Sequence, residues 1–557
     1  MKLVSIDAIQ GTGLYSPLAG QELRTRGVVT GVSRRGFFLQ DPEGDPEGEA
    51  SIGIFVYERR GKPKVGSLVE VVGRALDFAK SEGARPATQI EEQETHVIQE
   101  QGPVIEPVWL TAERVLIPHA QLRSLLNSLE GMLVGLPKGS IFTAPSNPFG
   151  DYVVLPPGGP LLRTEMGGVL INPSEPERWL PGFRLLDYDE APCVHVGAEL
   201  LDPVIGPLNF RSDSFQISAS GSARVGQSEV RLQPTTLVGE GAAVTVLTLN
   251  GFNLDPHIED AAAVNDPRRD VDDDIQDGRF QTLGQAIARD AREPDIVALQ
   301  EIQDDDGAEI TEVVSAQRTL ESLIRAIKKA GGPDYAWADV PPDALADGGQ
   351  PGGNIRNAFL YRPERVSIVA GSLRRLGDSS PAYEGSRKPL MARFALVQGQ
   401  GELDVINVHL ASKRHQNGLF APTDPGFDPR EELRVEQARL IADELRPLRE
   451  AGADYYVTGD FNDFEFSATL QELVGSSNVN LVDHVPGPLR FDYNHRGLSQ
   501  ALMHGIVAKR QLVDRQAQYE ILHANALLGV QPGRSGQKPS DHGYVIARLE
   551  LEPSSQR

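Results

Sequence analysis

The sequence is poor in cysteine, in aromatic residues and in long hydrophobic runs. Its single cysteine, Cys193, excludes an internal disulfide and a zinc site built from cysteines. No stretch approaches the ~20 consecutive apolar residues that a membrane-spanning helix needs. The first residues lack the apolar core of a secretory signal peptide, so we expect either a cytoplasmic protein or a chain whose leader has been removed.

Positive charge is also scarce, because 54 lysines and arginines are set against 78 aspartates and glutamates, which gives a net charge of -24. This balance argues against a basic nucleic-acid-binding surface over the whole protein. It excludes neither a local basic groove nor a metal ion that holds a phosphate. The length of 557 residues predicts two to four domains.

Residues 1–100 are expected to form a small β-barrel of the oligonucleotide/oligosaccharide-binding (OB) type. Short β-rich segments bounded by glycine occur at 28–32, 36–40, 53–57 and 68–73, without long helices between them. Four aromatic residues in these segments are compatible with base stacking and with a place in the core: Phe37, Phe38, Phe55 and Tyr57. Alternating strand aromatics are more often core residues, so we favour the core.

Residues 101–241 are rich in proline and glycine and predict a second β-rich module, for which an OB-type barrel is one alternative. Strands are expected at 130–134, 152–155 and 215–217, and short helices at 110–114 and 120–129. Cys193 and His195 lie here without a recognisable partner, so we interpret the thiol as packed and the histidine as a strand residue.

Residues 242–557 alternate strands with helical segments, which is typical of an α/β or layered α+β domain. A long acidic excursion, 255–278, contains the run Asp270 to Asp274. We interpret this run as a solvated charged segment, with a calcium site as the alternative.

Polar side chains end several apolar strands of this domain. The clearest case is 455–463, where a hydrophobic strand runs through Gly459 into Asp460, Asn462 and Asp463. The other strands end on or begin just after an amide, a carboxylate or a histidine: Asn250, Glu301, His409, and the pair Asp541 and His542. Ligands bind at the carboxyl ends of strands in α/β sheets. Oxygen ligands there suit Mg²⁺, and histidines beside them suit a phosphoryl group.

The motifs that carry these residues occur at 249–253, 298–302, 360–363, 407–413, 459–463 and 540–542. In this order they resemble the endonuclease/exonuclease/phosphatase superfamily, which includes deoxyribonuclease I and exonuclease III. The resemblance spans about residues 242–551 and implies a four-layered αββα sandwich. Residues 9–13 and 36–41 resemble the OB-type front module of bacterial extracellular nucleases in this superfamily, which implies an extracellular, periplasmic or cell-surface location.

The resemblance also implies roles for individual residues. The divalent ion, Mg²⁺ with Mn²⁺ or Ca²⁺ as alternatives, would be bound by Asn250, Glu301, Asp460 and Asp541. Asp460 and Asn462 would orient the attacking water, and His409 and His542 would contact the phosphate, with Tyr361 as a further catalytic residue. Substrate contacts would come from Arg356, Lys413, Asn253, and Arg387 or Lys388.

One position departs from the superfamily pattern. The strand before the last loop usually reads Leu-Asp-His, and its Asp orients the catalytic histidine, but here Met503 precedes His504. His542 therefore either lacks its orienting carboxylate or obtains one elsewhere, for which Asp492 is a candidate. Loss of such a carboxylate can cost orders of magnitude in rate.

The function expected from the sequence is a divalent-metal-dependent nuclease that hydrolyses phosphodiester bonds in DNA, or in RNA. One alternative keeps the fold and changes the substrate, as in a phosphomonoesterase or a sphingomyelinase-like phosphodiesterase. Another is a catalytically weakened nucleic-acid-binding protein, which Met503 alone supports. No amphipathic membrane-facing stretch favours a lipid substrate.

Overall fold

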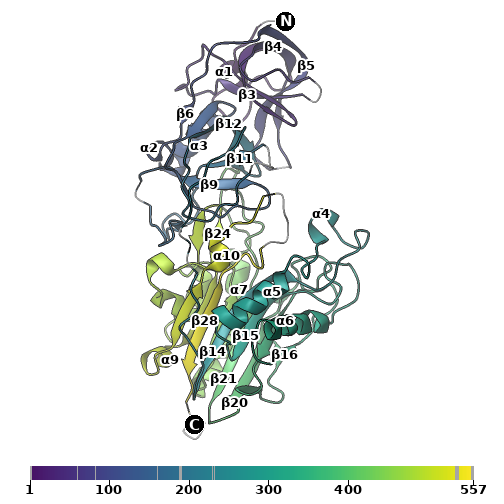
Figure 1. Cartoon of the computed structure of the whole chain (residues 1–557), viewed down its shortest axis with the longest axis vertical. Helices are drawn as coiled ribbons and strands as arrows, with labels where there is room; N and C mark the ends of the chain where they lie inside the picture. Colours follow the sequence, from purple (N-terminus) through teal and green to yellow (C-terminus); the bar gives the residue numbers. More distant parts are fainter. Residues whose placement is uncertain are drawn as a thin grey trace.

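The computed structural model describes residues 3–58, 61–81, 83–159, 161–186, 191–228, 230, 232–532 and 538–552. The molecule is elongated, with an N-terminal barrel at one end, a second β-rich module in the middle and an α/β domain at the other end (Figure 1). Among these residues, no helix is both long enough and apolar enough to cross a membrane.

The N-terminal part of the chain forms a closed barrel. Its elements are α1 (Ile6–Gln10), β1 (Glu22–Ser33), β2 (Gly36–Gln40), β3 (Gly53–Tyr57), β4 (Leu68–Phe78) and β5 (Ala87–Gln99). The strands close in the order β1-β2-β3-β5-β4, with β3 parallel to β5. Phe37 and Phe38 are buried, which confirms the core interpretation for these two, whereas Phe55 and Tyr57 are half-buried.

The middle module forms an open sheet rather than a second closed barrel. Its elements are β6 (Val108–Trp109), α2 (Ala112–Val115), α3 (His119–Ser128), β7 (Leu133–Leu136), β8 (Ile141–Phe142), β9 (Asp151–Leu155), β10 (Val169–Leu170), β11 (Gly182–Leu185), β12 (Val204–Arg211) and β13 (Ser214–Ala219). Seven of these strands pair in the order β6-β7-β12-β13-β11-β9-β8. The described strands of this module thus form an open sheet, and the OB-type alternative stays a prediction.

A buried arginine joins the barrel to the middle module. Arg85, in the turn before β5, donates to Glu130 at 2.6 Å and to Asn127 at 2.8 Å. Its guanidinium also lies over the rings of Phe210 and Phe215, 4.6 and 4.7 Å from their centroids. A buried charge is tolerated when it is paired and hydrogen-bonded, and these contacts meet that condition.

The α/β domain contains two sheets that face each other. The first consists of β14 (Ala243–Leu254), β15 (Ile296–Ile302), β16 (Ala336–Asp339), β17 (Arg356–Tyr361), β27 (Gln518–Leu522) and β28 (Tyr544–Glu550), in the order β16-β17-β15-β14-β28-β27. Its outer face is covered by α5 (Arg279–Gln285), the π-helical turn η1 (Ala286–Asp290) and α6 (Gln317–Lys329), whose Leu283 and Leu320 share one core with Leu247 and Leu299.

The second sheet consists of β18 (Val366–Ile368), β19 (Arg374–Arg375), β20 (Leu390–Leu396), β21 (Glu402–His409), β22 (Tyr455–Asp460), β23 (Asn478–Asn480) and β26 (Met503–Ala508). They pair in the order β18-β20-β21-β22-β26-β23, with β19 attached to β20. Helices α7 (Glu431–Glu450) and α8 (Ala468–Val474) cover its outer face, where Ile441 and Leu470 pack against Val408 and Val457.

Between the sheets lies a mostly apolar core that includes Val246, Phe359, Phe394 and Val405. Toward the carboxyl ends of β15 and β21 the layer becomes polar, since Gln300 donates to Asn407 across the gap at 2.6 Å. The order helix, sheet, sheet, helix is the four-layered arrangement expected for residues 242–557.

The remaining elements of the α/β domain lie mainly in its loops. They are α4 (Pro267–Asp270), η2 (Pro381–Tyr383), η3 (Leu481–His484), η4 (Gly487–Leu489), α9 (Lys509–Val513) and α10 (Ala524–Leu527). Two further strands, β24 (Tyr493–His495) and β25 (Leu498–Gln500), form a hairpin. This hairpin pairs with β10 of the middle module in a three-stranded sheet ordered β10-β25-β24.

The acidic excursion is folded rather than solvated. Asp255 and Asp274 are each only 1% exposed, and Asp274 is paired with Arg279. Burial, reinforced by the neighbouring Glu259, raises the pKa of Asp255 to about 9. The prediction of a solvated charged segment is wrong here because the excursion folds back and buries part of its own charge. The calcium alternative stays a prediction.

Candidate active site

The carboxyl ends of four strands meet at one edge of the sandwich. Asn250 on β14 lies beside Gln300 on the parallel strand β15, one residue before Glu301. In the facing sheet His409 on β21 pairs directly with Asp460 on the parallel strand β22. A Cβ on Gly459 would lie 1.9 Å from the Val408 carbonyl oxygen, so only glycine lets these two strands approach here.

The side chains from both sheets converge in a cluster of short contacts. The Asn250 amide donates to Glu301 Oε1 at 3.1 Å and to Asp460 Oδ2 at 3.4 Å. His409 Nε2 lies 3.7 Å from Glu301 and 3.6 Å from Asp460. His542 Nε2 lies 3.6 Å from Asp460 and 4.0 Å from Asp541. The structure thus brings together the predicted metal ligands and the two predicted phosphate-contacting histidines.

Backbone strain is concentrated around this cluster. Glu301 has a φ of 51° and Asn462 a φ of 52°, both in the left-handed region that residues other than glycine rarely adopt. Phe252 and Asn253 follow Asn250 with φ values of 55° and 59°. Such strain costs of order 1–3 kcal/mol per residue and persists where the surroundings fix the conformation, which is common at functional sites.

The carboxylates of the cluster carry an excess of buried negative charge. Burial, together with the neighbouring Asp541, raises the pKa of Glu301 to about 7. Burial likewise raises the pKa of Asp460. Oδ1 of Asp541 is buried and accepts no hydrogen bond from the described residues. A divalent cation would stabilise the charged carboxylates and give the Asp541 oxygen a partner, so this donor set fits a metal ion.

The donor set differs in one respect from the predicted ligands. Oδ1 of Asn250 accepts from the Phe252 amide at 2.8 Å, which turns the NH₂ group toward the two carboxylates. In this orientation the Asn250 amide holds Glu301 and Asp460 in place, and its oxygen does not point toward the carboxylates as a metal ligand would. Within this cluster, the ligand atoms of Glu301, His409 and Asp460 all lie within 4.8 Å of one another.

The departure at Met503 is compensated from elsewhere in the chain. Asp492, which is fully buried, accepts a hydrogen bond from Nδ1 of His542 at 2.8 Å. Its other oxygen accepts from the backbone amides of Leu502 and Met503, at 2.7 and 3.0 Å. The Asp492 carboxylate thus lies beside residue 503, where the superfamily has its Asp, and it is oriented by the backbone amides at that position.

The two histidines differ in charge. Burial disfavours the imidazolium of His542, but Asp460, Asp541 and the hydrogen bond to Asp492 outweigh it and raise the pKa to about 10. Burial, with Arg387 and His542 nearby, holds the pKa of His409 well below its usual value. At neutral pH His542 is therefore cationic and His409 neutral.

The predicted substrate-binding residues divide into two groups. Arg387 is buried, donates to the Leu410 carbonyl at 2.9 Å, and interacts electrostatically with Glu301 and Asp460. Lys413 lies 3.1 Å from Asp463 and 3.5 Å above the Phe464 ring, with its side chain 22% exposed. Both belong to the edge that carries the cluster. Asn253 is half-buried three residues beyond Asn250.

Three other predicted residues are engaged elsewhere. Arg356 is buried and bound to Asp339, and Lys388 is paired with Asp347. Tyr361 pairs with Ile296 at the start of β15, whereas Glu301 lies near its end. Tyr361 lies on the expected strand, but the antiparallel pairing places it at the end of the strands away from Glu301. The prediction that Tyr361 is a catalytic residue is therefore wrong.

Tyr493 is a site residue that the sequence did not reveal. Its ring lies 4.6 Å from that of His542, at an interplanar angle of 30°. Burial raises its phenol pKa, and the carboxylates of Asp541 and Asp460 reinforce the effect. Tyr493 lies in a hairpin between the family motifs, so only the position next to Asp492 could have indicated it.

Comparison with known families agrees with this geometry. Residues 249–542, more than half of the chain, match the endonuclease/exonuclease/phosphatase family. The chain belongs to this family. The endonuclease/exonuclease/phosphatase family consists of hydrolases that act on phosphoester bonds, and it includes nucleases, phosphodiesterases and phosphatases. Residues 95–229 match a family described as a domain of unknown function.

Solved structures of this family resemble part of the chain. Truncated TDP2 of Caenorhabditis elegans is 14% identical and covers 56% of this chain and 98% of its own, with a TM-score of 0.34. The catalytic domain of human Nocturnin with a bound sulfate anion is 12% identical, covers 57% and 97%, and has a TM-score of 0.36. A family member from Bacteroides thetaiotaomicron is 15% identical, covers 58% and 97%, and has a TM-score of 0.34. No curated protein matches.

Proposed function

We propose that this member of the endonuclease/exonuclease/phosphatase family is a metal-dependent nuclease that hydrolyses phosphodiester bonds in DNA, or in RNA. The observation that carries the proposal is the Asp492–His542 pair beside the buried carboxylate of Asp460 and the half-buried carboxylates of Glu301 and Asp541. It supplies a fixed cation next to a donor set suited to a divalent ion, which is the combination that phosphoryl transfer requires.

In the proposed reaction, Asp460 accepts the proton of the attacking water. Asn462 keeps this carboxylate in place, because its backbone amide donates to Asp460 Oδ1 at 2.9 Å and its side chain to Oδ2 at 3.3 Å. The Nε2–H of His542 donates to a non-bridging oxygen of the phosphate, and Asp492 holds the ring in that orientation. Arg387 adds positive charge at the same edge.

A bound Mg²⁺, Mn²⁺ or Ca²⁺ would offset the charge that develops on the phosphate and lower the pKa of the attacking water. Glu301, Asp460 and Asp541 would hold it, with Asn250 orienting the first two. His409, neutral and in reach of Glu301 and Asp460, would either join these ligands or donate to the phosphate.

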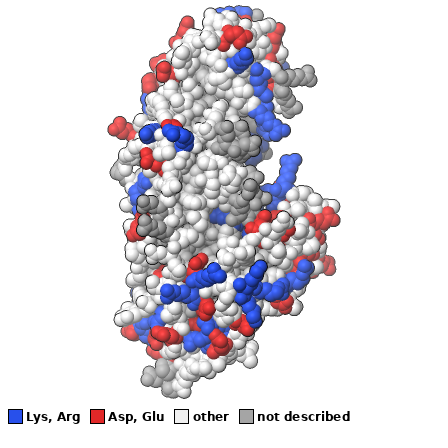
Figure 2. Space-filling view, in the orientation of Figure 1, with Lys and Arg blue, Asp and Glu red and all other residues white. Residues whose placement is uncertain are grey.

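The N-terminal barrel supports a polymeric substrate. We propose that it is an OB-type module, because its strand order and the parallel pairing of β3 with β5 match that fold. The proposed division is residues 1–100, 101–241 and 242–557. Basic side chains run down the right-hand side of the barrel end in Figure 2, on a chain whose net charge is -24.

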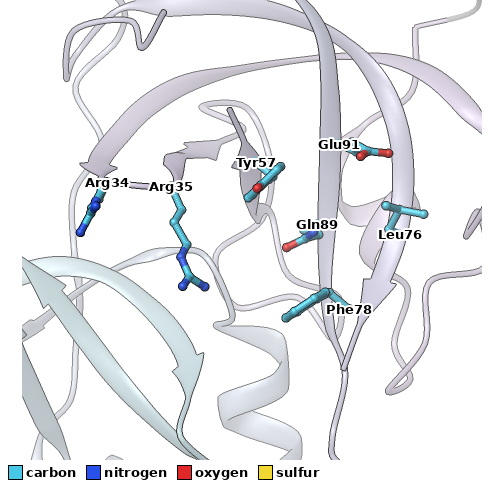
Figure 3. A pocket seen from close by; sticks show the side chains of 7 residues that line it. All are labelled: Arg34, Arg35, Tyr57, Leu76, Phe78, Gln89 and Glu91. Carbon is cyan, nitrogen blue, oxygen red and sulfur yellow. The ribbon is translucent and has the colours of Figure 1, made fainter. Parts of the chain in front are cut away.

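A hollow of about 740 Å³ opens on the barrel. Its lining includes two exposed arginines in the turn between β1 and β2, Arg34 and Arg35, and two aromatic rings, Tyr57 and Phe78 (Figure 3). Phe78 is 57% exposed. Guanidinium groups suit phosphates and exposed rings suit bases, so the hollow fits a single-stranded segment of nucleic acid.

The alternative, a phosphomonoesterase or a sphingomyelinase-like enzyme with the same site, lacks such support. A small phosphomonoester bound at the cluster would make no contact with the hollow on the barrel or with its arginines. The extracellular or cell-surface location stays a prediction from the resemblance.

The decisive experiment is cleavage of supercoiled plasmid and of bis(p-nitrophenyl) phosphate with Mg²⁺, Mn²⁺, Ca²⁺ or EDTA. We expect metal-dependent nicking of the plasmid that EDTA abolishes and added metal restores, because three neighbouring carboxylates without a cation repel the phosphate. Hydrolysis of phosphomonoesters or sphingomyelin, without plasmid cleavage, would replace the nuclease by the alternative. Cleavage that EDTA leaves intact would contradict the metal site.

Replacing both arginines, in the variant R34A/R35A, is expected to weaken binding of a single-stranded oligonucleotide about tenfold and to leave bis(p-nitrophenyl) phosphate hydrolysis unchanged. If both contact phosphates, the slope of log K against log salt falls by ~1.4. The control is R24A/R26A, which removes two arginines of the same barrel that bind Glu70 instead of lining the hollow. Equal effects of the two variants would show that the arginines act only through the overall charge of the barrel, and not through contacts made in the hollow.

A further inference from the structure

The middle module lies against the loops that carry the active site. Three loops of the catalytic domain, 410–421, 485–502 and 523–532, reach across to it. Figure 1 shows β24 and α10, from the last two, between the middle module and the sandwich. In the first loop Leu419 and Phe420 enter the core of the middle module, and Arg123 of α3 donates to the Ala421 carbonyl at 2.9 Å.

The hairpin of the second loop is completed by the middle module. Its strand β25 pairs in parallel with β10, with Val169 opposite Leu498 and Leu170 opposite Ser499. The Ile171 amide extends this ladder by donating to the Ser499 carbonyl at 3.1 Å. An isolated two-stranded hairpin is marginal in water, so the third strand is what gives it a fixed place.

The tip of the hairpin fits closely against the middle module. Gly497 has a φ of +88°, and a Cβ there would lie 2.5 Å from Thr143 Oγ1, 2.7 Å from Val153 and 3.2 Å from Leu180. Beside it, the Asn494 side chain donates to the Thr143 carbonyl at 2.8 Å. A methyl group at this tip therefore requires either the hairpin or the side chains of Thr143 and Val153 to shift.

The same hairpin carries the partner of His542. Asp492 immediately precedes β24, and Tyr493 begins it, with its ring 4.6 Å from the His542 ring. One residue earlier, Phe491 is buried against Val196 of the middle module. A shift of the hairpin therefore moves the carboxylate and the ring that define the position of His542.

The backbone of His542 is held through the third loop. The Asn525 side chain donates to the His542 carbonyl at 2.7 Å. Further along, the loop is bound to the middle module where Ser146 donates to the Val530 carbonyl at 2.7 Å and the Gly529 amide donates to His195 Nδ1 at 3.0 Å. Both members of the Asp492–His542 pair thus lie on segments that are attached to the middle module.

We propose that the middle module is a positioning element for catalysis: β10 and the Thr143 region hold the hairpin of Asp492 and Tyr493 against His542. The proposal rests on the proposed phosphodiesterase function and adds a task for residues 95–229. Asn494 and Gly497 are then positioning residues, which act on the reaction only through Asp492 and Tyr493. A spacer between barrel and catalytic domain would need neither contact.

The test compares Gly497→Ala with Gly371→Ala in the full chain. Both glycines adopt positive φ, +88° and +79°, but Gly371 has no atom within 4 Å of an added Cβ. The backbone strain is therefore shared, and only Gly497→Ala disturbs the docking. We expect Gly497→Ala to lower kcat on bis(p-nitrophenyl) phosphate ~10- to 100-fold with little change in KM, and Gly371→Ala to change neither. Asn494→Ala, which removes the hydrogen bond to Thr143 without straining the backbone, should also lower kcat.

A double-mutant cycle shows whether the effect passes through Asp492. In an Asp492→Asn background, Gly497→Ala should cost less than about twofold, because the interaction that it disturbs is already lost. An equal cost in both backgrounds, or an equal cost of Gly497→Ala and Gly371→Ala, would overturn the proposal.

A readout without turnover separates this proposal from the proposed function. The Nδ1 proton of His542, bound to Asp492, should give a downfield proton resonance that is absent from His542→Ala. We expect Gly497→Ala to weaken or shift this resonance and Gly371→Ala to leave it in place. If the parent protein cleaves no phosphodiester, the proposed function fails while the resonance still decides the positioning role. An unchanged resonance in Gly497→Ala, with normal activity, would leave the nuclease intact and remove the positioning role.

Discussion

Asp460→Asn is expected to lower kcat on plasmid DNA by about 10³-fold or more while the protein stays folded. The Asp460 carboxylate lies within 3.6 Å of four other residues of the site: Asn250, His409, Asn462 and His542. The amide can neither accept the proton of the attacking water nor bind a divalent ion as a carboxylate does. Initial rates of nicking at saturating metal, measured beside the parent, check this expectation.

The matched control is Asp483→Asn, which removes the same charge from an exposed position in the same domain. It should cleave at the parent rate. The unfolding temperature of Asp460→Asn should stay within a few degrees of the parent, because asparagine has nearly the same shape. Parent-like activity of Asp460→Asn would show that the cluster on β14, β15, β21 and β22 is not the site of hydrolysis.

Asp492→Asn is expected to lower kcat ~10²- to 10⁴-fold, the range seen when the orienting carboxylate of a catalytic histidine is lost. Asparagine can keep the hydrogen bonds to the Leu502 and Met503 amides, but its NH₂ then faces the Nδ1–H of His542, so two donors meet. The ring loses its orientation and its stabilised charge. Because the two residues act as a unit, His542→Ala should add little to Asp492→Asn, and full additivity of the two losses would contradict the pairing.

Met503→Asp, which restores the superfamily pattern, is expected to harm rather than help. Met503 is fully buried in an apolar cluster with Val485, Ile521 and Val545, and Asp492 already fills the place of the carboxylate. A second buried carboxylate would have no partner, which lowers the unfolding temperature. Met503→Leu, which keeps the volume and polarity, should be close to neutral. A gain in activity for Met503→Asp would mean that Asp492 is a poor substitute.

The sequence predicted the elements of the site better than their contacts. Buried strands that end on polar residues are visible in the pattern, so Glu301, His409 and Asp460 could be predicted together. The register of antiparallel strands is not visible in the same pattern. The pattern therefore does not reveal that Tyr361 lies beside the start of β15, away from Glu301. Likewise Arg356 lies on the expected strand but is engaged with Asp339 of the neighbouring strand β16, a pairing that the local pattern does not indicate.

The sequence alone identifies Asp492 only as one candidate for the carboxylate that orients His542, because the position of Asp492 depends on a different part of the chain. It lies 50 residues before His542 in sequence, in a hairpin that pairs with β10. No local pattern fixes where such a hairpin lies. Strand β5 shows a milder form of the difficulty: it is polar along most of its length and largely exposed, so the hydrophobic pattern that revealed its neighbours is missing.

The position of β28 has a consequence for the order of folding. This strand lies between β14 and β27 in the first sheet, although it follows β14 by about 300 residues. Its pairing with β14 closes the longest loop in the domain, and such contacts form late because their entropy cost is large. Asp541 and His542 directly precede β28, so the proposed metal ligand and the histidine that binds Asp492 take their places together with this strand. The edge that carries the cluster is therefore completed only when this long-range pairing of β14 with β28 forms, and residues 242–522 folded without β28 would lack both Asp541 and His542.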